Sequence, residues 1–224
     1  MNELELTGRA RTHVLELEQP HCILHYEVVA AFLAMRDTAA RFGIDLQAAS
    51  SFRDFGTQLR IWNQKWNGTR PVLDPYGRKL ERDGGTDAQW ADAILRWSAI
   101  PGGSRHHWGS DLDIIDRAAM PAGYRVQLVP EEYAPDGVFA KITTWLDDNM
   151  SHFGFFRPYA TDRGGVCPEP WHLSYAPVAV PALESLSLSL LRQTLNDTAF
   201  EGKAEILGRL PEIYTRFLLA VDFA

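Results

Sequence analysis

The pattern of apolar and polar residues along this 224-residue chain changes between helical and strand periodicity. Apolar residues recur at three- and four-residue spacing in four segments, which predicts helices over residues 22–42, 56–66, 87–100 and 139–155. Alternation predicts a strand that ends at Ala49 and another over residues 110–116. Residues 67–86, rich in Gly, Pro, Asp and Arg, are expected to form a loop. This mixed order of helices and strands favours an α+β fold over a doubly wound sheet.

The last part of the chain has helical patterns only. Two such patterns, over residues 182–195 and 203–222, are separated by Asn196 and Asp197. Pro211 is expected to kink or restart the second helix, because proline cannot donate the backbone hydrogen bond of a helix interior. We expect these helices to pack against the rest of the protein or against a partner subunit.

Composition limits the classes of partner and site. The chain is 46% hydrophobic and has seven tryptophans, which is enough for one substantial core. Its formal net charge is -7 and no window is dominated by Lys and Arg, so nucleic acid is not an expected partner. Cys22 and Cys167 are the only cysteines and form no C-x-x-C pattern, so any metal is expected to take imidazole and carboxylate ligands.

The N-terminal residues lack the basic start and apolar run of a secretory signal. No segment approaches the roughly 18 consecutive apolar residues of a membrane span. On this pattern we expect a soluble protein that stays in the cytoplasm, with a periplasmic or exported location as the alternative.

The segment SRHHWGSDLDI gathers two histidines and two aspartates in a chain with seven histidines in all. A catalytic zinc takes three protein ligands from His, Asp or Glu and keeps a fourth position for water, whose pKa it lowers. His106 and Asp113 can converge on such a metal only if the chain turns at Gly109. His172 in EPWH is the natural third ligand, because Glu169 precedes it closely enough to act as a base.

The same residues carry a resemblance to a known family. SRHHWGSDLD and EPWH are similar to the paired signature of the VanY-type D-alanyl-D-alanine carboxypeptidases, zinc metallopeptidases of the M15 family and the LAS group, whose pattern is S-x-H-x-x-G-x-A-x-D and then E-x-W-H. The resemblance extends to SSFRDFGTQ, PGGS and FGFFRPY and covers residues 22–178. It implies a small antiparallel sheet flanked by helices, with a zinc peptidase domain over residues 1–178 and a C-terminal helical extension over residues 179–224 packed on the same domain.

The family pattern implies a role for each matching residue. Zinc would be bound by His106, Asp113 and His172. Glu169 matches the general base that takes a proton from the zinc-bound water and passes it to the leaving amine. Arg53 matches the arginine that contacts the substrate carbonyl or carboxylate, a task that its planar guanidinium suits. The residues expected to shape the substrate site are Ser104, Gln58 and Trp171.

Some positions depart from the pattern or admit two interpretations. Asp111 stands where the family usually has Ala and is predicted on the same strand face as Asp113, as a hydrogen-bond acceptor behind the metal or as extra negative charge. Only the family register separates Asp111 from Asp113, and His106 from His107, as ligands. His107 is expected at the site rim or on the surface, with a hydrogen-bonding role behind a ligand as the alternative. Trp171 is expected either in the site wall or in the core.

The resemblance implies a zinc-dependent D,D-carboxypeptidase that removes the C-terminal D-alanine from a peptidoglycan stem peptide. The alternatives are an L,D-carboxypeptidase acting on tetrapeptide stems and a non-catalytic binding protein that keeps the zinc fold. Glu169 disfavours the binding protein, because a structural metal needs no base beside an open position. Without a visible export signal, such an enzyme is expected to trim recycled or precursor muropeptides inside the cell, to be exported by another route, or to act on a substrate other than wall peptide.

Overall fold

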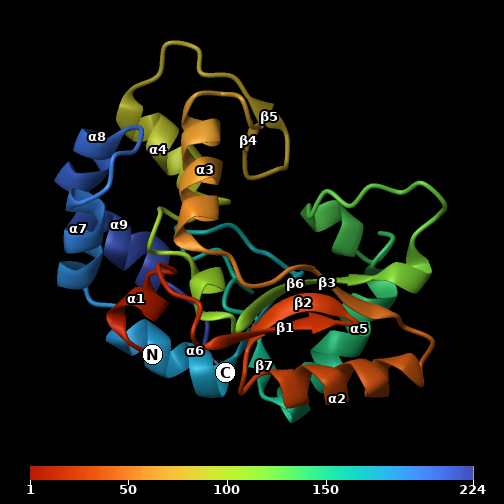
Figure 1. Cartoon of the computed structure of the whole chain (residues 1–224). Helices are drawn as coiled ribbons and strands as arrows, with labels where there is room; N and C mark the ends of the chain where they lie inside the picture. Colours follow the sequence, from red (N-terminus) through yellow and green to blue (C-terminus); the bar gives the residue numbers. More distant parts are fainter. Residues whose placement is uncertain (224) are drawn as a thin grey trace.

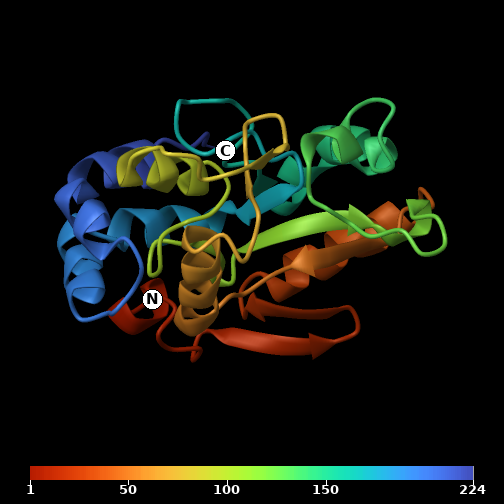
Figure 2. The ribbon, with the colours of Figure 1, turned by 90° about the horizontal axis from the view of Figure 1, so that it is seen from above.

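The computed structural model describes residues 1–223 and has short strands near its middle with helices around them (Figures 1 and 2). The helices are α1 (Glu3–Leu6), α2 (Val29–Ala40), α3 (Phe55–Trp66), α4 (Asp87–Leu95), α5 (Ala140–Asn149), α6 (Ala176–Ser185), α7 (Leu188–Asn196), α8 (Lys203–Gly208) and α9 (Leu210–Ile213). The strands are β1 (Val14–Glu18), β2 (His21–His25), β3 (Leu46–Ser50), β4 (Val72–Leu73), β5 (Lys79–Leu80), β6 (Asp111–Asp116), β7 (Phe155–Phe156) and β8 (His172–Tyr175). A 3-10 turn over Arg105–Trp108 lies between α4 and β6. Helix α9 continues as a π-helical segment over Tyr214–Leu219.

The sheet that carries the functional residues has the order β3-β6-β8-β7, and all of its neighbouring strands are antiparallel. Strand β6 lies inside this sheet, and all of its residues except Ile115 are buried. Its register places Asp113 opposite His172 on β8 and opposite Ser50 on β3, where a β-bulge shifts the pairing. The predicted α+β class with a small antiparallel sheet is confirmed.

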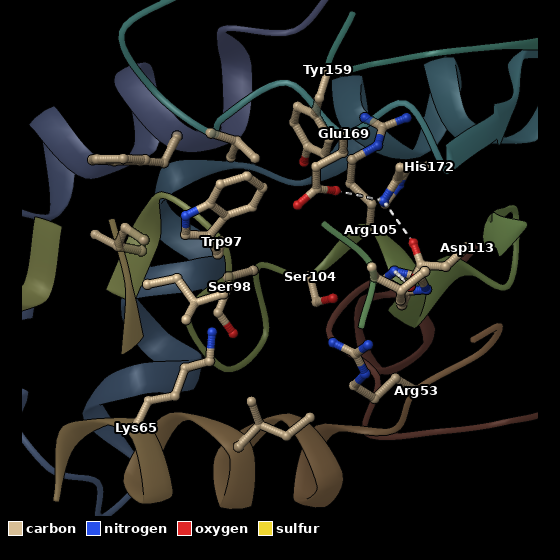
Figure 3. Close-up of a pocket in the computed structure, with 18 of the residues that line it drawn as sticks. Arg53, Lys65, Trp97, Ser98, Ser104, Arg105, Asp113, Tyr159, Glu169 and His172 are labelled. Carbon is tan, nitrogen blue, oxygen red and sulfur yellow. Dashed lines mark ion pairs between the residues drawn. The ribbon is translucent and has the colours of Figure 1, made fainter. Parts of the chain in front are cut away.

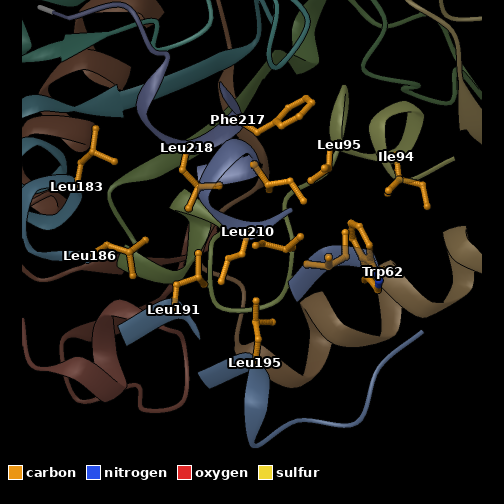
Figure 4. Close-up of a cluster of buried hydrophobic side chains, with 14 of the residues drawn as sticks. Trp62, Ile94, Leu95, Leu183, Leu186, Leu191, Leu195, Leu210, Phe217 and Leu218 are labelled. Carbon is orange, nitrogen blue, oxygen red and sulfur yellow. The ribbon is translucent and has the colours of Figure 1, made fainter. Parts of the chain in front are cut away.

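Apolar side chains form two clusters of buried residues on different sides of the site. One cluster contains Phe32 of α2, Leu112 and Ile114 of β6, and Ile142 of α5, so that α2 and α5 cover the sheet. The second cluster joins α3 and α4 to the C-terminal helices (Figure 4). The residues after 178 therefore pack against the helices that surround the site, while the boundary at residue 178 stays a prediction.

Leu191 of α7 offers a test of this packing, because its side chain is fully buried in the second cluster and borders Gly102. We expect Leu191→Ala to lower the free energy of unfolding by about 2–5 kcal/mol, since it removes buried methyl groups and leaves a cavity. Urea unfolding followed by circular dichroism measures this. The matched control is Leu219→Ala, because Leu219 is 38% exposed; equal losses in both variants would contradict the packing described here.

The structure differs from the predicted elements at several places. Residues 22–25 belong to β2 rather than to the start of a helix, because they pair with β1 in a hairpin, and the helix begins at Val29. The predicted loop over 67–86 contains the short β4–β5 hairpin. The helix predicted over 139–155 ends at Asn149 and is followed by a 3-10 turn and β7.

The tail keeps its helical character but has more breaks than its pattern suggests. The residues predicted as one helix over 182–195 are divided between α6 and α7, because Ser187 caps α7 by accepting a hydrogen bond from the Leu190 backbone N–H. The predicted restart at Pro211 is confirmed, since α8 ends at Gly208 and Pro211 lies in the first turn of α9. Within residues 1–223, no helix combines the length and the hydropathy needed to cross a membrane.

Candidate metal centre and active site

Gly109 makes the turn that brings the two halves of the SRHHWGSDLDI segment together. Its φ of 66° lies in the left-handed region that favours glycine. A Cβ atom at this position would lie 2.6 Å from Val14 Cγ1 and 2.7 Å from the His25 backbone nitrogen. Only glycine fits here, and the chain can therefore pass from the 3-10 turn that carries His106 directly into the strand that carries Asp113.

The structure brings His106, Asp113 and His172 together. One ligand atom from each of these buried residues lies within 4.8 Å of the other two. His106 Nε2 is 3.6 Å from Asp113 Oδ2, and His172 Nδ1 is 3.4 Å from Asp113 Oδ1. Because β6 and β8 pair at Asp113 and His172, the sheet register itself fixes two of the three positions.

The outer nitrogens of the two imidazoles are held by hydrogen bonds away from this cluster. His106 Nδ1 lies 2.9 Å from the Ser51 carbonyl oxygen, and His172 Nε2 lies 3.0 Å from Asp111 Oδ1. Both oxygens are acceptors, so each outer nitrogen donates and the inner nitrogen is left to bind a cation. Asp113 Oδ1 is buried and accepts no hydrogen bond from residues 1–223. Two imidazole nitrogens and a carboxylate form a donor set that fits zinc.

Glu169 lies beside the same cluster, with Oε2 3.1 Å from His172 Nδ1. Burial raises the pKa of Glu169, which is consistent with a carboxyl group that exchanges protons rather than one held permanently in an ion pair. Burial alone would lower the pKa of His172, but the surrounding carboxylates of Asp111, Asp113 and Glu169 outweigh burial and raise that pKa well above its ordinary value. The centre therefore has an excess of negative charge that favours a cation.

The contacts of Asp111 show that its role differs from that of Asp113, the candidate ligand. It is fully buried, and burial would raise its pKa, but the Arg105 guanidinium outweighs burial and holds the pKa well below the usual range. Arg105 Nε donates to Asp111 Oδ1 at 2.7 Å, and Ser110 Oγ donates to Oδ2 at 2.5 Å. Asp111 is thus an ionised acceptor behind His172, which was one of the two interpretations of this position.

Two hydrogen bonds fix the guanidinium group of Arg53. Its NH1 donates to Gln58 Oε1 at 2.8 Å and its NH2 donates to Ser50 Oγ at 3.2 Å. Gln58 is fully buried and also donates to the Ala99 carbonyl at 2.6 Å. Arg53 lines the pocket and Gln58 is not among its lining residues, so the geometry gives Gln58 a contact with Arg53 rather than with a substrate.

The expectation that His107 lies at the rim or on the surface is wrong. His107 is fully buried, because Gly8 packs so closely that a Cβ there would lie 2.3 Å from the ring. Its Nδ1 donates to the Arg53 carbonyl at 2.6 Å, and its Nε2 accepts from the Gly102 N–H at 3.2 Å. His107 therefore ties the backbone of Arg53 to the Gly-Gly turn before Ser104, which agrees with the hydrogen-bonding alternative.

A pocket of about 290 Å³ opens onto these residues (Figure 3). Its lining includes all three candidate ligands together with Arg53, Ser104, Glu169 and Trp171. Trp171 is only 4% exposed and stacks on Trp97, with ring centroids 6.1 Å apart. Both interpretations of Trp171 apply, since one side chain packs in the core and also borders the pocket.

The pocket also has lining residues that the sequence analysis did not identify. They are contributed by segments far apart in the chain and include Lys65, Trp97, Tyr159, Phe217 and Leu218. Of these, Lys65 carried a detectable signal, because it lies seven residues after Gln58 and thus on the same face of α3. Phe217 and Leu218, near the C-terminus, carried no such signal in the sequence, because their approach to the pocket depends on tertiary packing.

Comparison with known proteins agrees with this geometry. The sequence profile of the VanY family, described as D-alanyl-D-alanine carboxypeptidase, matches residues 21–178. An uncharacterized protein of Haemophilus influenzae is 34% identical over 122 residues, which is 54% of this chain and 93% of that protein. A D-alanyl-D-alanine carboxypeptidase of Enterococcus faecalis is 30% identical over 142 residues, which is 62% of this chain and 43% of that protein.

Solved structures of the same family share the fold. The vancomycin resistance D,D-pentapeptidase VanY from a VanB-type cassette, a Glu-to-Ala variant in complex with Zn(II), has a TM-score of 0.53 and 25% identity over 75% of this chain and 82% of its own. VanYB in complex with D-alanine-D-alanine has a TM-score of 0.54 and 23% identity over 83% of this chain and 89% of its own. With the family profile matching well over half of the sequence, this chain belongs to the VanY family of D-alanyl-D-alanine carboxypeptidases.

Proposed function

We propose that this carboxypeptidase uses zinc to hydrolyse the amide bond before the C-terminal D-alanine of peptidoglycan stem pentapeptides, which is D,D-carboxypeptidase activity. The observation that carries the proposal is the convergence of His106, Asp113 and His172 within 4.8 Å, in one pocket with Glu169 and Arg53. The solved relative with Zn(II) and the one with D-alanine-D-alanine support the choice of metal and substrate.

His106 Nε2, His172 Nδ1 and one Asp113 carboxylate oxygen would hold the metal, because these atoms face one another in the cluster. When bound, zinc supplies a Lewis acid that polarises the scissile carbonyl and makes water a stronger acid. Asp111 and the Ser51 carbonyl keep the two imidazoles in the tautomers that this role needs.

The chain's own residues move the protons and position the peptide. Glu169 takes a proton from the attacking water and gives it to the leaving amine nitrogen, so that one carboxyl group acts as base and then as acid. Arg53, held by Gln58 and Ser50, donates to the oxygen on which negative charge develops. Ser104 and Trp171 line the same pocket as Glu169 and Arg53 and are positioned to contact the peptide.

Asp111 is expected to strengthen zinc binding through its hydrogen bond with His172. The change Asp111→Asn keeps an oxygen acceptor but removes the charge that faces Arg105 and the His172 N–H. We expect zinc affinity to fall about 10- to 100-fold, as is usual when an outer partner of a ligand is changed. Competition with a zinc-binding dye measures the Kd. The control is Asp83→Asn at an exposed position, and an unchanged Kd in the Asp111 variant would contradict this role.

Mass spectrometry of the zinc-loaded protein incubated with a stem pentapeptide and a stem tetrapeptide tests the proposed function. Loss of one alanine from the pentapeptide, absent with Glu169→Ala, is the expected result. Loss of alanine from the tetrapeptide alone would replace the proposal by L,D-carboxypeptidase activity. Cleavage of neither peptide, with zinc bound, would overturn the assignment of a stem-peptide substrate.

A further inference from the structure

Lys65 is a buried cation in the pocket without a partner of opposite charge. It lies on α3, is 7% exposed, and lines the pocket. Among residues 1–223, no side chain or carbonyl forms a hydrogen bond or ion pair with its ammonium group, whereas the surface residue Lys79 pairs with Glu81. A charge with so little solvent around it is costly unless something compensates it. This position therefore suits an anion supplied from outside the protein.

The surroundings of Lys65 show where that anion would lie. In Figure 3, Lys65 lies on the opposite side of Ser104 from Asp113 and His172, and it points into the same pocket. Burial and, after it, the positive charge of Arg70 lower the pKa of Lys65 to about 8, while the negative charge of Glu169 acts in the opposite direction. The ammonium group and the Glu169 carboxyl thus face a common space without touching.

The depth of this position limits which part of a substrate can reach it. Ser104, Leu218 and Lys65 are each less than a tenth exposed, whereas Arg70 and Gln127, which also line the pocket, are exposed. The long end of a stem peptide continues into a larger molecule and must leave through the exposed side. The short end, a single terminal residue beyond the scissile bond, is the part that fits at the buried side.

The two arginines on the metal side of the pocket are already engaged. The buried Arg105 donates to Asp111 and to Ser174. Arg53 donates to Gln58 and Ser50, and the charges of Asp113 and Glu169 act on it, which places it at the metal side. Lys65 has no such contacts. A carboxypeptidase must stabilise a developing oxyanion and also recognise a free terminal carboxylate, and these are two separate tasks for cations.

We propose that Lys65 binds the free C-terminal carboxylate of the substrate and thereby selects chain ends, while Arg53 acts on the scissile carbonyl. The inference rests on the proposed carboxypeptidase function and adds a specificity-determining residue to it. Apolar side chains that line the same pocket suit the methyl group of a terminal alanine; they include Ile61, Leu95, Phe217 and Leu218.

Two substrates that differ only at the C-terminus test this assignment. One is N-acetyl-D-alanyl-D-alanine with a free carboxylate, and the other is the same peptide with a C-terminal amide. The variants are Lys65→Met, which keeps the length of the side chain, Lys65→Arg, which keeps the charge, and Lys79→Met as a control for loss of a surface lysine. Circular dichroism verifies that each variant is folded.

We expect Lys65→Met to lower kcat/KM for the acid roughly 10- to 100-fold, mainly through KM, and to leave the slower amide reaction unchanged. Lys65→Arg should recover part of the preference for the acid, and Lys79→Met should behave as the unchanged protein. Equal losses on acid and amide would overturn the assignment, since the effect of Lys65 would then not depend on the terminal carboxylate. No loss on either substrate would overturn it as well.

A binding measurement separates failure of this inference from failure of the proposed function. Calorimetric titration uses the zinc-loaded Glu169→Ala protein with and without Lys65→Met. Tighter binding of the acid than of the amide, lost on Lys65→Met, supports the role of Lys65 even if turnover is absent. Equal binding of acid and amide before the change would overturn it, and absence of turnover in the unchanged protein alone would overturn the proposed reaction.

Discussion

Replacing Glu169 by alanine is expected to lower kcat for release of the terminal D-alanine by about 10²–10⁴-fold, the usual contribution of general acid–base catalysis. Glu169 lies in the pocket beside the metal cluster, and its Oε2 is 3.1 Å from His172 Nδ1. Since it is the base in our account and not a ligand, the variant should still bind one zinc ion per chain. Steady-state kinetics together with metal analysis by mass spectrometry measure both quantities.

Two further variants make this result specific. Glu169→Gln keeps the shape of the side chain but cannot accept a proton, so it should lose nearly as much activity as the alanine variant. Glu184→Ala removes an exposed glutamate of α6 and should leave kcat unchanged. An enzyme that keeps most of its kcat after Glu169→Gln, with zinc bound, would show that proton transfer does not depend on this residue.

Removing one of the inner ligands is expected to abolish both metal binding and activity. His106→Ala and Asp113→Ala each delete one of the three donors, and a site with two donors cannot hold zinc against a competing chelator. We expect less than a tenth of the zinc content of the unchanged protein after dialysis, by analogy with the roughly 10- to 100-fold loss that changes even behind a ligand produce. Activity should fall to the level of the protein treated with a chelator.

His152→Ala is the matched control for the histidine variant, because His152 is exposed and lies outside the pocket lining. Its zinc content and activity should be unchanged, and added zinc should restore the chelated protein but not His106→Ala. Full zinc content in His106→Ala would mean that the metal binds elsewhere.

The sequence predicted the fold class and the residues that converge at the candidate site, but not the bounds of several elements, for reasons that are visible at particular residues. Short-range spacing was enough to name Gly109, His106 and Asp113, because the turn that joins them is local. His172 lies far along the chain, on the strand that pairs with β6, and was named from its own EPWH motif and the family register. The burial of His107 was missed, since it depends on close packing of Gly8, about a hundred residues earlier. Lys65 was missed because no motif contains it, and its seven-residue spacing from Gln58 on α3 was the one signal that it carried.

The errors in the fold have a common cause. Residues 22–25 form a continuous apolar run apart from His25, and such a run fits both helical and strand periodicity. Pairing with β1 decides in favour of a strand, and periodicity within the segment cannot reveal that partner. The break between α6 and α7 is similar, because Ser187 looks like any polar residue on a helix until its hydroxyl caps the next helix.

Diffraction from crystals grown with zinc, recorded on both sides of the zinc absorption edge, tests the central claim most directly. The account predicts one anomalous peak bounded by His106 Nε2, His172 Nδ1 and an Asp113 carboxylate oxygen, at the usual zinc distances of about 2.0–2.2 Å. Glu169 and Lys65 should lie outside the coordination sphere. A peak coordinated by Asp111 instead of Asp113, or zinc bound only at other residues, would contradict the account.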